Sequence, residues 1–250
     1  MGQILRYNDF LLTYKTRGYR LKHLEEWKKF FPIKASPEIS GVVGDIFCDG
    51  HLQANPKWRI DFTSKDLGEL KRFNNSFYNI FKIKGKVREC KYNSFSKSYN
   101  LGINCAVVSR ILFLLGVPTG EKVLRLFDVP AWIKQDKECF KLFCRRCFTC
   151  EGTIMHDGRK IPQIRMEFWK QKDLIKKDKF VKNIAKCLEY HFSIDSSIGY
   201  PNSRCIRRDK IITRPIKLYL MGKNVIKFYS QVGFEGLKQK SLKAHIAGYI

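Results

Sequence analysis

Two short motifs in this 250-residue sequence place an acidic residue directly before a glycine. The first contains Asp49 and Gly50, the second contains Glu151 and Gly152, and the two acids lie 102 residues apart. Each pair follows an apolar stretch typical of a helix, so we expect both carboxylates at helix C-termini, where the helix dipole disfavours negative charge. A bound divalent cation would offset this cost, and hard carboxylate oxygens suit Mg²⁺. The alternative is that each pair only terminates a helix.

The segments around the two acids resemble each other, which indicates an internal duplication. Leu101 and Gly116 are 15 residues apart, as are Leu218 and Gly233. One duplication of roughly 100 residues explains these matches, with each copy arranged as helix–strands–helix–strands–helix. Two acids at equivalent positions of such copies are expected to meet at a pseudo-twofold axis.

This organisation predicts four segments. Residues 1–37 form a helical N-terminal extension that stops near Pro32, and residues 38–122 form the first repeat. Residues 123–138, which contain Pro130, form a linker, and residues 139–250 form the second repeat.

The charge of the chain indicates a polyanionic partner. The sequence has 48 Lys and Arg against 23 Asp and Glu, a formal net charge of +25 that is spread along the whole chain. Such a surface attracts nucleic acid over a long range, although a merely basic enzyme is the alternative. With 44% apolar and 14% aromatic residues the chain is not disordered. It has no apolar run long enough to span a membrane and no export signal, so we expect an intracellular protein without a membrane partner.

Alternating residues after each acid predict strands with one apolar and one open face. Trp58, Ile60 and Phe62 mark the apolar face in the first copy, as Ile164 and Met166 do in the second. The open faces carry side chains of the kinds that hydrogen-bond base edges, and lysines near the strand ends suit phosphate. The predicted DNA-binding residues are Gln53, Asn55, Lys57, Arg59, Lys65, Gln163, Arg165, Lys170, Lys217 and Tyr219. An ordinary solvated strand face is the alternative at each single position.

The nine cysteines are expected to be reduced. Cys139, Cys144, Cys147 and Cys150 have a spacing that could supply a metal cluster. We favour the other interpretation, in which small residues spaced by three line one helix face and help helices to pack.

Four segments, in order, resemble the LAGLIDADG homing endonucleases, particularly the single-chain kind encoded in archaeal introns. Val42–Leu52 is similar to the first motif of that family and Phe143–Ile154 to the second. Leu115–Lys122 with Val129–Ile133 resembles the segment that joins the halves. The closing segment is similar to Asn224–Phe228 and Val232–Phe234, with Lys238 and Lys240.

The resemblance implies an α/β (α+β) fold of two tandem αββαββα units, each with a curved antiparallel sheet that covers a DNA major groove. It implies that Asp49 and Glu151, with Gly50 and Gly152, form the metal site, and that Lys122 and Lys238 assist catalysis. The activity it implies is Mg²⁺-assisted hydrolysis of both strands of a double-stranded DNA target by a monomer, leaving short 3′ overhangs.

The sequence departs from the family pattern at the two motif helices. Cys48 and Cys150 replace small residues before the acids, and Arg146 stands where the first helix has Gly44. We expect Arg146 either to separate the helices or to extend out of their interface. Two other functions share this fold: an RNA maturase that binds intron RNA, and a basic nucleic-acid-binding protein without catalysis.

Overall fold

The computed structural model describes residues 2–14, 23–90, 97–156 and 162–247, and its internal contacts divide the chain into two compact units. The first unit is Met1–Gly120 and the second is Glu121–Ile250. The boundary therefore falls just before the end of the predicted first repeat. The segment predicted as a linker folds as part of the second unit.

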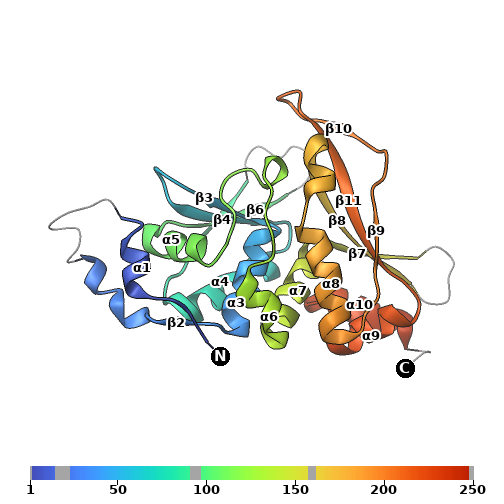
Figure 1. Ribbon diagram of the computed structural model, residues 1–250, viewed down its shortest axis with the longest axis horizontal. Coiled ribbons are helices and arrows are strands. Elements are labelled where there is room, and N and C mark those ends of the chain that lie inside the picture. The colour runs from blue at the N-terminus through green and yellow to red at the C-terminus, as the bar shows by residue number, and fades with distance from the viewer. Residues whose placement is uncertain (1, 15–22, 91–96, 157–161, 248–250) are drawn as a thin grey trace. The chain divides into compact units, whose positions relative to one another are not determined.

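The first unit contains one copy of the predicted αββαββα order (Figure 1). Its antiparallel sheet has the strand order β3-β4-β6-β5. Phe62 of the sheet stacks on Phe73 with ring centroids 4.5 Å apart, and both rings are buried. The elements are α3 (Pro37–Phe47), β3 (Gly50–Gln53), β4 (Arg59–Ser64), α4 (Leu67–Phe81), β5 (Lys86–Glu89), β6 (Tyr99–Ile103) and α5 (Ala106–Leu114).

Helix α3 begins where its sequence provides a cap and a proline. The Ser36 hydroxyl oxygen accepts a hydrogen bond from the Ile39 amide at 3.3 Å, and Pro37 occupies the first turn, where its missing N–H costs nothing. Every residue from Ile39 to Phe47 is buried. This helix is therefore a central element of the first unit's core, and its C-terminus lies directly before Asp49.

The second unit repeats the order and extends it. Its sheet has the order β10-β11-β8-β7, with β9 also paired to β11. The Asp136 carboxylate caps α7 by accepting from the Cys139 amide at 2.9 Å, and this bond lowers the pKa of Asp136. The elements are η2 (Lys122–Leu124), α6 (Ala131–Gln135), α7 (Lys137–Glu151), β7 (Gly152–Met155), β8 (Gln163–Gln171), η3 (Lys172–Lys177), α8 (Phe180–Phe192), β9 (Ser197–Gly199), β10 (Cys205–Ile206), β11 (Ile212–Leu220), α9 (Lys223–Gln231) and α10 (Gly236–Ile246).

The described part of the N-terminal extension contains short strands as well as helical turns. It contains a helix, α1 (Tyr7–Leu11), and a 3-10 turn, η1 (Lys28–Phe30), but β1 (Gln3–Leu5) pairs antiparallel with β2 (Ile33–Lys34). Residues 1 and 15–22 of the extension lie outside the described residues. None of the described helices is both long enough and apolar enough to cross a membrane.

The predicted strand over residues 52–62 is a hairpin. Strands β3 and β4 pair in the register Leu52↔Ile60 and Gln53↔Arg59, and residues 54–58 form the turn between them. The alternating pattern suggested one continuous strand because Trp58 is buried like the strand residues. Trp58 belongs to the turn, however, and its φ is +40°. Asn55 and Lys57 are therefore exposed turn residues and not members of a strand face.

Candidate functional site

Asp49 lies where the sequence predicted it, beyond the C-terminus of α3. The residue is exposed, and its carbonyl oxygen accepts a hydrogen bond from the Thr63 amide at 3.4 Å. Gly50 is buried, and a Cβ atom there would lie 2.5 Å from the Cα atom of Ile46. The chain can therefore turn from helix into strand at this point only with a glycine after the acid.

Glu151 occupies the equivalent position as the last residue of α7, where it is partly buried. A Cβ atom on Gly152 would lie 2.2 Å from the carbonyl oxygen of Phe148. In both units the obstructing residue is four positions before the glycine, so the two acid–glycine pairs share one local geometry. The close approach of strand to helix explains the glycine of each pair. It does not explain the acid, which is Asp49 in one unit and Glu151 in the other.

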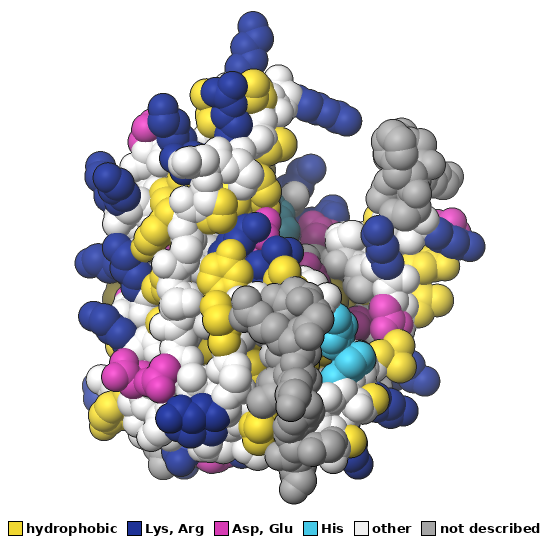
Figure 2. All heavy atoms as spheres, turned by 90° about the vertical axis from the view of Figure 1, so that its right-hand side faces the viewer, with side chains coloured by type: hydrophobic (Ala, Val, Ile, Leu, Met, Phe, Trp, Pro, Cys, Tyr) yellow, Lys and Arg dark blue, Asp and Glu magenta, His cyan; other side chains and the backbone are white. Residues whose placement is uncertain are grey.

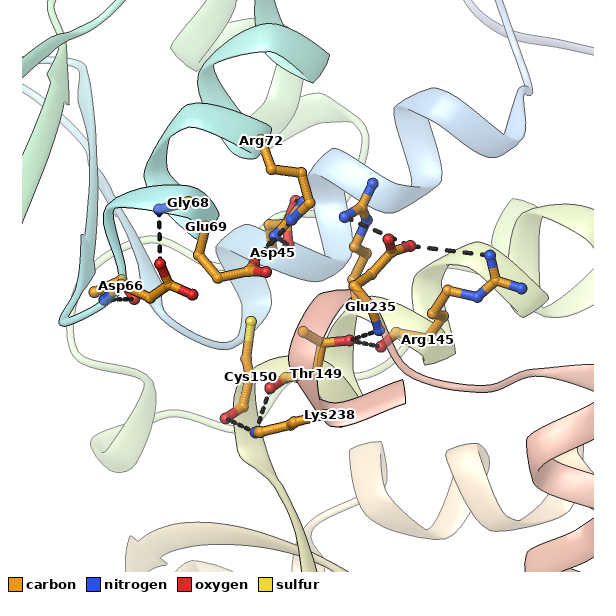
Figure 3. A network of polar contacts seen from close by, with 12 residues as sticks. Asp45, Asp66, Gly68, Glu69, Arg72, Arg145, Thr149, Cys150, Glu235 and Lys238 are labelled. Carbon is orange, nitrogen blue, oxygen red and sulfur yellow. Dashed lines mark hydrogen bonds and ion pairs between the residues drawn. The ribbon is translucent and has the colours of Figure 1, made fainter. Parts of the chain in front are cut away.

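Lys238 of α10 binds the C-terminal end of α7, next to Glu151. Its ammonium donates to the carbonyl oxygens of Thr149 and, at 3.5 Å, of Cys150 (Figure 3). It also donates to the carbonyl oxygen of Gly152 at 2.8 Å. A lysine at this position satisfies carbonyl groups that have no helical partner and opposes the negative end of the helix dipole. Glu151 and Lys238 also line one open pocket of about 570 Å³.

A second network fixes the segment that precedes α10. The Glu235 amide donates to the Thr149 hydroxyl at 2.9 Å (Figure 3). Arg145 Nε donates to the Val232 carbonyl oxygen at 2.7 Å. Arg146 is buried with 8% of its surface exposed, and its Nη1 lies 3.7 Å from a Glu235 carboxylate oxygen. Arg146 thus does not extend into solvent, which was one of the two outcomes expected for it.

Sequence reasoning missed a buried ion pair in α3. Asp45 is fully buried, and both of its carboxylate oxygens accept from Arg72 of α4, at 2.7 and 2.9 Å (Figure 3). Arg72 Nε also donates to Glu69 at 2.8 Å. Burial alone would lower the pKa of Arg72, but the carboxylates of Asp45 and Glu69 outweigh it and raise that pKa. An aspartate inside an apolar helix was the available signal, although its partner lies 27 residues away.

Two of the predicted DNA-binding residues of the first unit lie opposite each other at the end of the β3–β4 hairpin. Gln53 and Arg59 are register partners on the open face of the sheet, and Arg59 Nε donates to Asp61 at 2.8 Å. Lys65 is exposed just after β4. The same face also carries Asn100 and Arg88, register partners on β6 and β5 that sequence reasoning did not select.

On the sheet of the second unit, Lys217 and Tyr219 of β11 pair in register with Glu167 and Arg165 of β8. Glu167 lies between two cations, 3.1 Å from Lys217 Nζ and 3.6 Å from Arg165 Nε. Gln163 belongs to this face but is only 7% exposed. Lys217, Tyr219, Glu167 and Arg165 form an open face. If this face binds DNA, its two cations must outweigh the negative charge of Glu167.

Exposed basic residues continue along the β10–β11 hairpin, which sequence reasoning did not select. Lys and Arg side chains project there in Figure 2, at the upper end of the molecule where Figure 1 places β10. The exposed members are Arg204, Arg208 and Lys210. The signal was present in the sequence as a local cluster of positive charge.

Lys170 corrects one prediction. It was expected to contact phosphate, but its side chain is 1% exposed and its ammonium donates to the carbonyl oxygens of Lys122 at 2.9 Å and Arg125 at 2.8 Å. Asp178 lies 3.5 Å away. Burial lowers the pKa of Lys170 to about 8, against the opposing effect of Asp178. Lys170 therefore anchors the η2 segment to β8 and does not reach a DNA surface.

Three cysteines of α7 pack as apolar residues. Cys139, Cys144 and Cys147 are buried and all nine cysteines are free. Burial raises the pKa of the Cys144 thiol well above its usual range. Within the described residues no group of three or more His, Cys, Asp or Glu side chains could hold a metal ion. The helix-face interpretation of these cysteines agrees with their burial.

The absence of a three-ligand group among the described residues limits how a cation would be bound. Asp49 and Glu151 each offer one carboxylate at a helix end, and neither belongs to a cage of three protein ligands among the described residues. Mg²⁺ is commonly bound by one or two carboxylates, with water and phosphate oxygens completing its shell. The donor chemistry of the two acids therefore fits a divalent cation that is shared with a phosphate substrate.

Comparison with known proteins identifies the fold. No protein-family model matches the chain. The chain is 24% identical over 253 residues to the DNA-directed RNA polymerase subunit Rpo1N of Methanocaldococcus jannaschii, covering 92% of this chain but 18% of that subunit. Among solved structures, full-length DUF199/WhiA from Thermatoga maritima has a TM-score of 0.52 at 16% identity, over 87% of this chain and 62% of that one.

Two homing endonucleases give similar scores. The mesophilic variants of I-DmoI match with a TM-score of 0.55 at 13% identity, over 84% of this chain and 98% of theirs. I-WcaI bound to its DNA recognition sequence matches with a TM-score of 0.56 at 13% identity, over 96% of this chain and 98% of its own. I-DmoI has also been crystallised with its target DNA in the presence of magnesium. At these identities the likeness shows the fold, and the chain has the LAGLIDADG fold that its motifs predicted.

Proposed function

We propose that this chain is a site-specific DNA endonuclease that cuts both strands of a double-stranded target. The observation that carries the proposal is the equivalent placement of Asp49 and Glu151, each beyond or at the end of a helix in one of two repeated units. A structural cap needs no acid at either position, because the glycine alone satisfies the close approach. Two acids retained at both helix ends are explained by a shared chemical task.

DNA is the substrate that the surfaces favour. The net charge of +25 and the open strand faces, which carry Arg59 and Asn100 in one unit and Arg165 and Lys217 in the other, suit a duplex partner. The structures of I-DmoI and I-WcaI with DNA support the same assignment. Tandem units in one chain and the family-like motif segments lead us to propose a monomer of the single-chain type, with an intracellular role in intron homing.

In this proposal Asp49 and Glu151 would each bind a divalent cation through one carboxylate. The cation would neutralise a scissile phosphate and promote ionisation of an attacking water. Lys238 fixes the end of α7 through three carbonyl oxygens and so positions Glu151, while the strand faces bind the duplex. We also propose that Lys122, which lies in η2, assists catalysis. Cleavage with short 3′ overhangs is the product that we expect.

A DNA-binding protein without nuclease activity is the second candidate. It is favoured by the ammonium of Lys238, which already supplies a cation at the helix end beside Glu151. In that case Glu151 would be held in place by charge and would not bind metal.

Selection from a library of duplexes separates the two candidates. Duplexes retained by the protein in Ca²⁺ report binding, and duplexes cut in Mg²⁺ report cleavage. We expect Asp49→Asn and Glu151→Gln to bind selected duplexes with nearly unchanged affinity but to lose double-strand cleavage. The matched control is Glu138→Gln, which removes an exposed carboxylate from the other end of α7. Retention of specific duplexes by the wild-type protein without any Mg²⁺-dependent cutting would establish the second candidate.

A further inference from the structure

The N-terminal extension, to which the proposed function assigns no task, packs on the last helix of the first unit. Helix α1 lies beside α5 in Figure 1, and Phe10 of α1 is fully buried. Phe10 also fixes the residues that follow α1. Its carbonyl oxygen accepts from the Thr13 hydroxyl at 2.7 Å, and its ring centre lies 5.3 Å from that of Tyr14.

Arg110 of α5 joins this extension to the β3–β4 turn. Its guanidinium carbon lies 4.2 Å from the ring centre of Tyr14 and 4.4 Å from the ring centre of Trp58. Its Nη1 also donates to the Thr13 carbonyl oxygen. A guanidinium over an aromatic ring is attracted to it, and more strongly where water is excluded. The extension, α5 and the turn therefore meet at this one side chain.

The β3–β4 turn has a backbone conformation that needs support from outside the turn. Trp58, its last residue, has a φ of +40°, which is unfavourable for a bulky side chain. Such strain persists only where the surrounding structure fixes it. Helix α5 supplies that support, because the Ser109 hydroxyl donates to the Trp58 carbonyl oxygen at 3.1 Å. The ring centre of Phe113 lies 5.7 Å from that of Trp58, and Arg110 lies over the same ring.

The same turn carries two of the predicted DNA-binding residues, Asn55 and Lys57, and both are exposed. The Trp58 amide closes the turn by donating to the Ala54 carbonyl oxygen at 3.3 Å. A turn that is already ordered before binding avoids the entropic cost of ordering it on the duplex. Holding Trp58 in place therefore favours any contact that Asn55 and Lys57 make with DNA.

We propose that Arg110 is a positioning residue, through which the N-terminal extension holds the β3–β4 turn in its DNA-binding conformation. The inference rests on the proposed function for its DNA partner, but not on cleavage or on a metal ion. The guanidinium faces two rings and a carbonyl oxygen, so Arg110 acts on DNA through Trp58 and not by contacting a phosphate.

Hydrogen exchange in the free full-length protein tests the positioning without DNA. Arg110→Met removes the charge and the bond to Thr13, so we expect the Trp58 amide to exchange about tenfold faster, because the turn opens more often. Arg110→Lys keeps the charge but loses the planar fork, and should give a smaller increase. The matched control is Lys71→Met, which removes an exposed charge from α4 of the same unit and should leave this amide unchanged. Unchanged exchange in Arg110→Met overturns the proposal.

Binding of the preferred duplex in Ca²⁺ tests the consequence for DNA. We expect Arg110→Met to weaken binding about tenfold, the cost of ordering the turn on the duplex, and Lys71→Met to bind like the wild type. Tyr14→Leu removes the ring under the guanidinium and should also weaken binding, whereas Tyr14→Phe keeps the ring and should not. Lys57→Gln should weaken binding less in the Arg110→Met background than in the wild type, because its contact depends on the turn.

Salt dependence separates positioning from direct contact. Removing an arginine that binds a phosphate would make the log–log salt slope shallower by about one, whereas Arg110→Met should keep the wild-type slope. The proposal is overturned if the slope changes by about one while Tyr14→Leu binds normally. It is also overturned if Arg110→Met and Lys71→Met bind alike, or if Lys57→Gln has the same effect in both backgrounds. If no duplex is bound specifically, the proposed function fails, and the exchange experiment alone decides whether Arg110 holds the turn.

Discussion

Replacing Asp45 with Asn tests whether the buried ion pair holds the first motif helix in place. Asn has nearly the same shape but no charge, so Arg72 loses the ionic partner that accepts two of its hydrogen bonds. Breaking a buried pair by removing one partner typically costs about 3–5 kcal/mol. Arg72 keeps Glu69 at 2.8 Å, and its side chain is 17% exposed, so water can reach it. We therefore expect the lower end, a loss of about 3 kcal/mol.

Thermal unfolding measures this loss. If the chain unfolds as one cooperative unit of 250 residues, about 3 kcal/mol corresponds to a decrease of roughly 6–12 °C in melting temperature. Glu69→Gln is the control, because it removes the less buried partner of the same arginine and should cost less than about 1 kcal/mol. The double variant with Arg72→Met should lose less than the sum of its single changes. A melting temperature for Asp45→Asn within about 1 °C of wild type would refute the reasoning.

Three further outcomes follow from the charges described above. Lys238→Met should destabilise the protein by about 1.5–3 kcal/mol in urea unfolding, because it removes charged hydrogen bonds from the end of α7, whereas the exposed Lys240→Met should have almost no effect. The free energy of unfolding of the wild-type protein, relative to that of Lys170→Met, should rise by about 3 kcal/mol between pH 8 and 10.5. The reason is that the pKa of Lys170 is lowered to about 8 in the folded state, whereas the unfolded chain keeps the proton to higher pH. A difference between the two variants that does not change with pH would contradict this. DNA affinity should fall with salt with a log–log slope near −9, for about ten neutralised phosphates, and a slope shallower than about −3 on the preferred duplex would exclude binding along both units.

The sequence predicted those features that local pattern determines. The acid–glycine pairs lie at helix ends as expected, because the glycine, the apolar stretch before it and the strand after it are all adjacent in the chain. The repeated αββαββα order followed from the same local signals. Local pattern does not predict which distant residues pair, and the contact between Asp45 and Arg72 is the clearest case.

Lys170 was misplaced although a signal for its position existed. Ile164, Met166 and Phe168 are buried, and continuing their alternation by one step predicts that residue 170 is buried as well. Lys170 was predicted to follow the strand, and lysines are rarely buried without a partner, but β8 extends to Gln171. The partners of Lys170 are backbone carbonyl groups of the η2 segment, and no sequence pattern predicts such a contact. The strand pair of the N-terminal extension was not predicted either, since β1 and β2 pair across about 30 residues.

The close approach at Gly50 and Gly152 has a consequence for how this gene can drift. Aspartate and glutamate codons differ only at the third base, so a single base change exchanges one acid for the other. The chain carries Asp49 in one unit and Glu151 in the other. Every amino-acid change at either glycine adds a Cβ atom where 2.5 or 2.2 Å is available. The two repeats can thus differ in the length of the acidic side chain. Any substitution of the glycine beside it, in contrast, is expected to destabilise the turn from helix to strand.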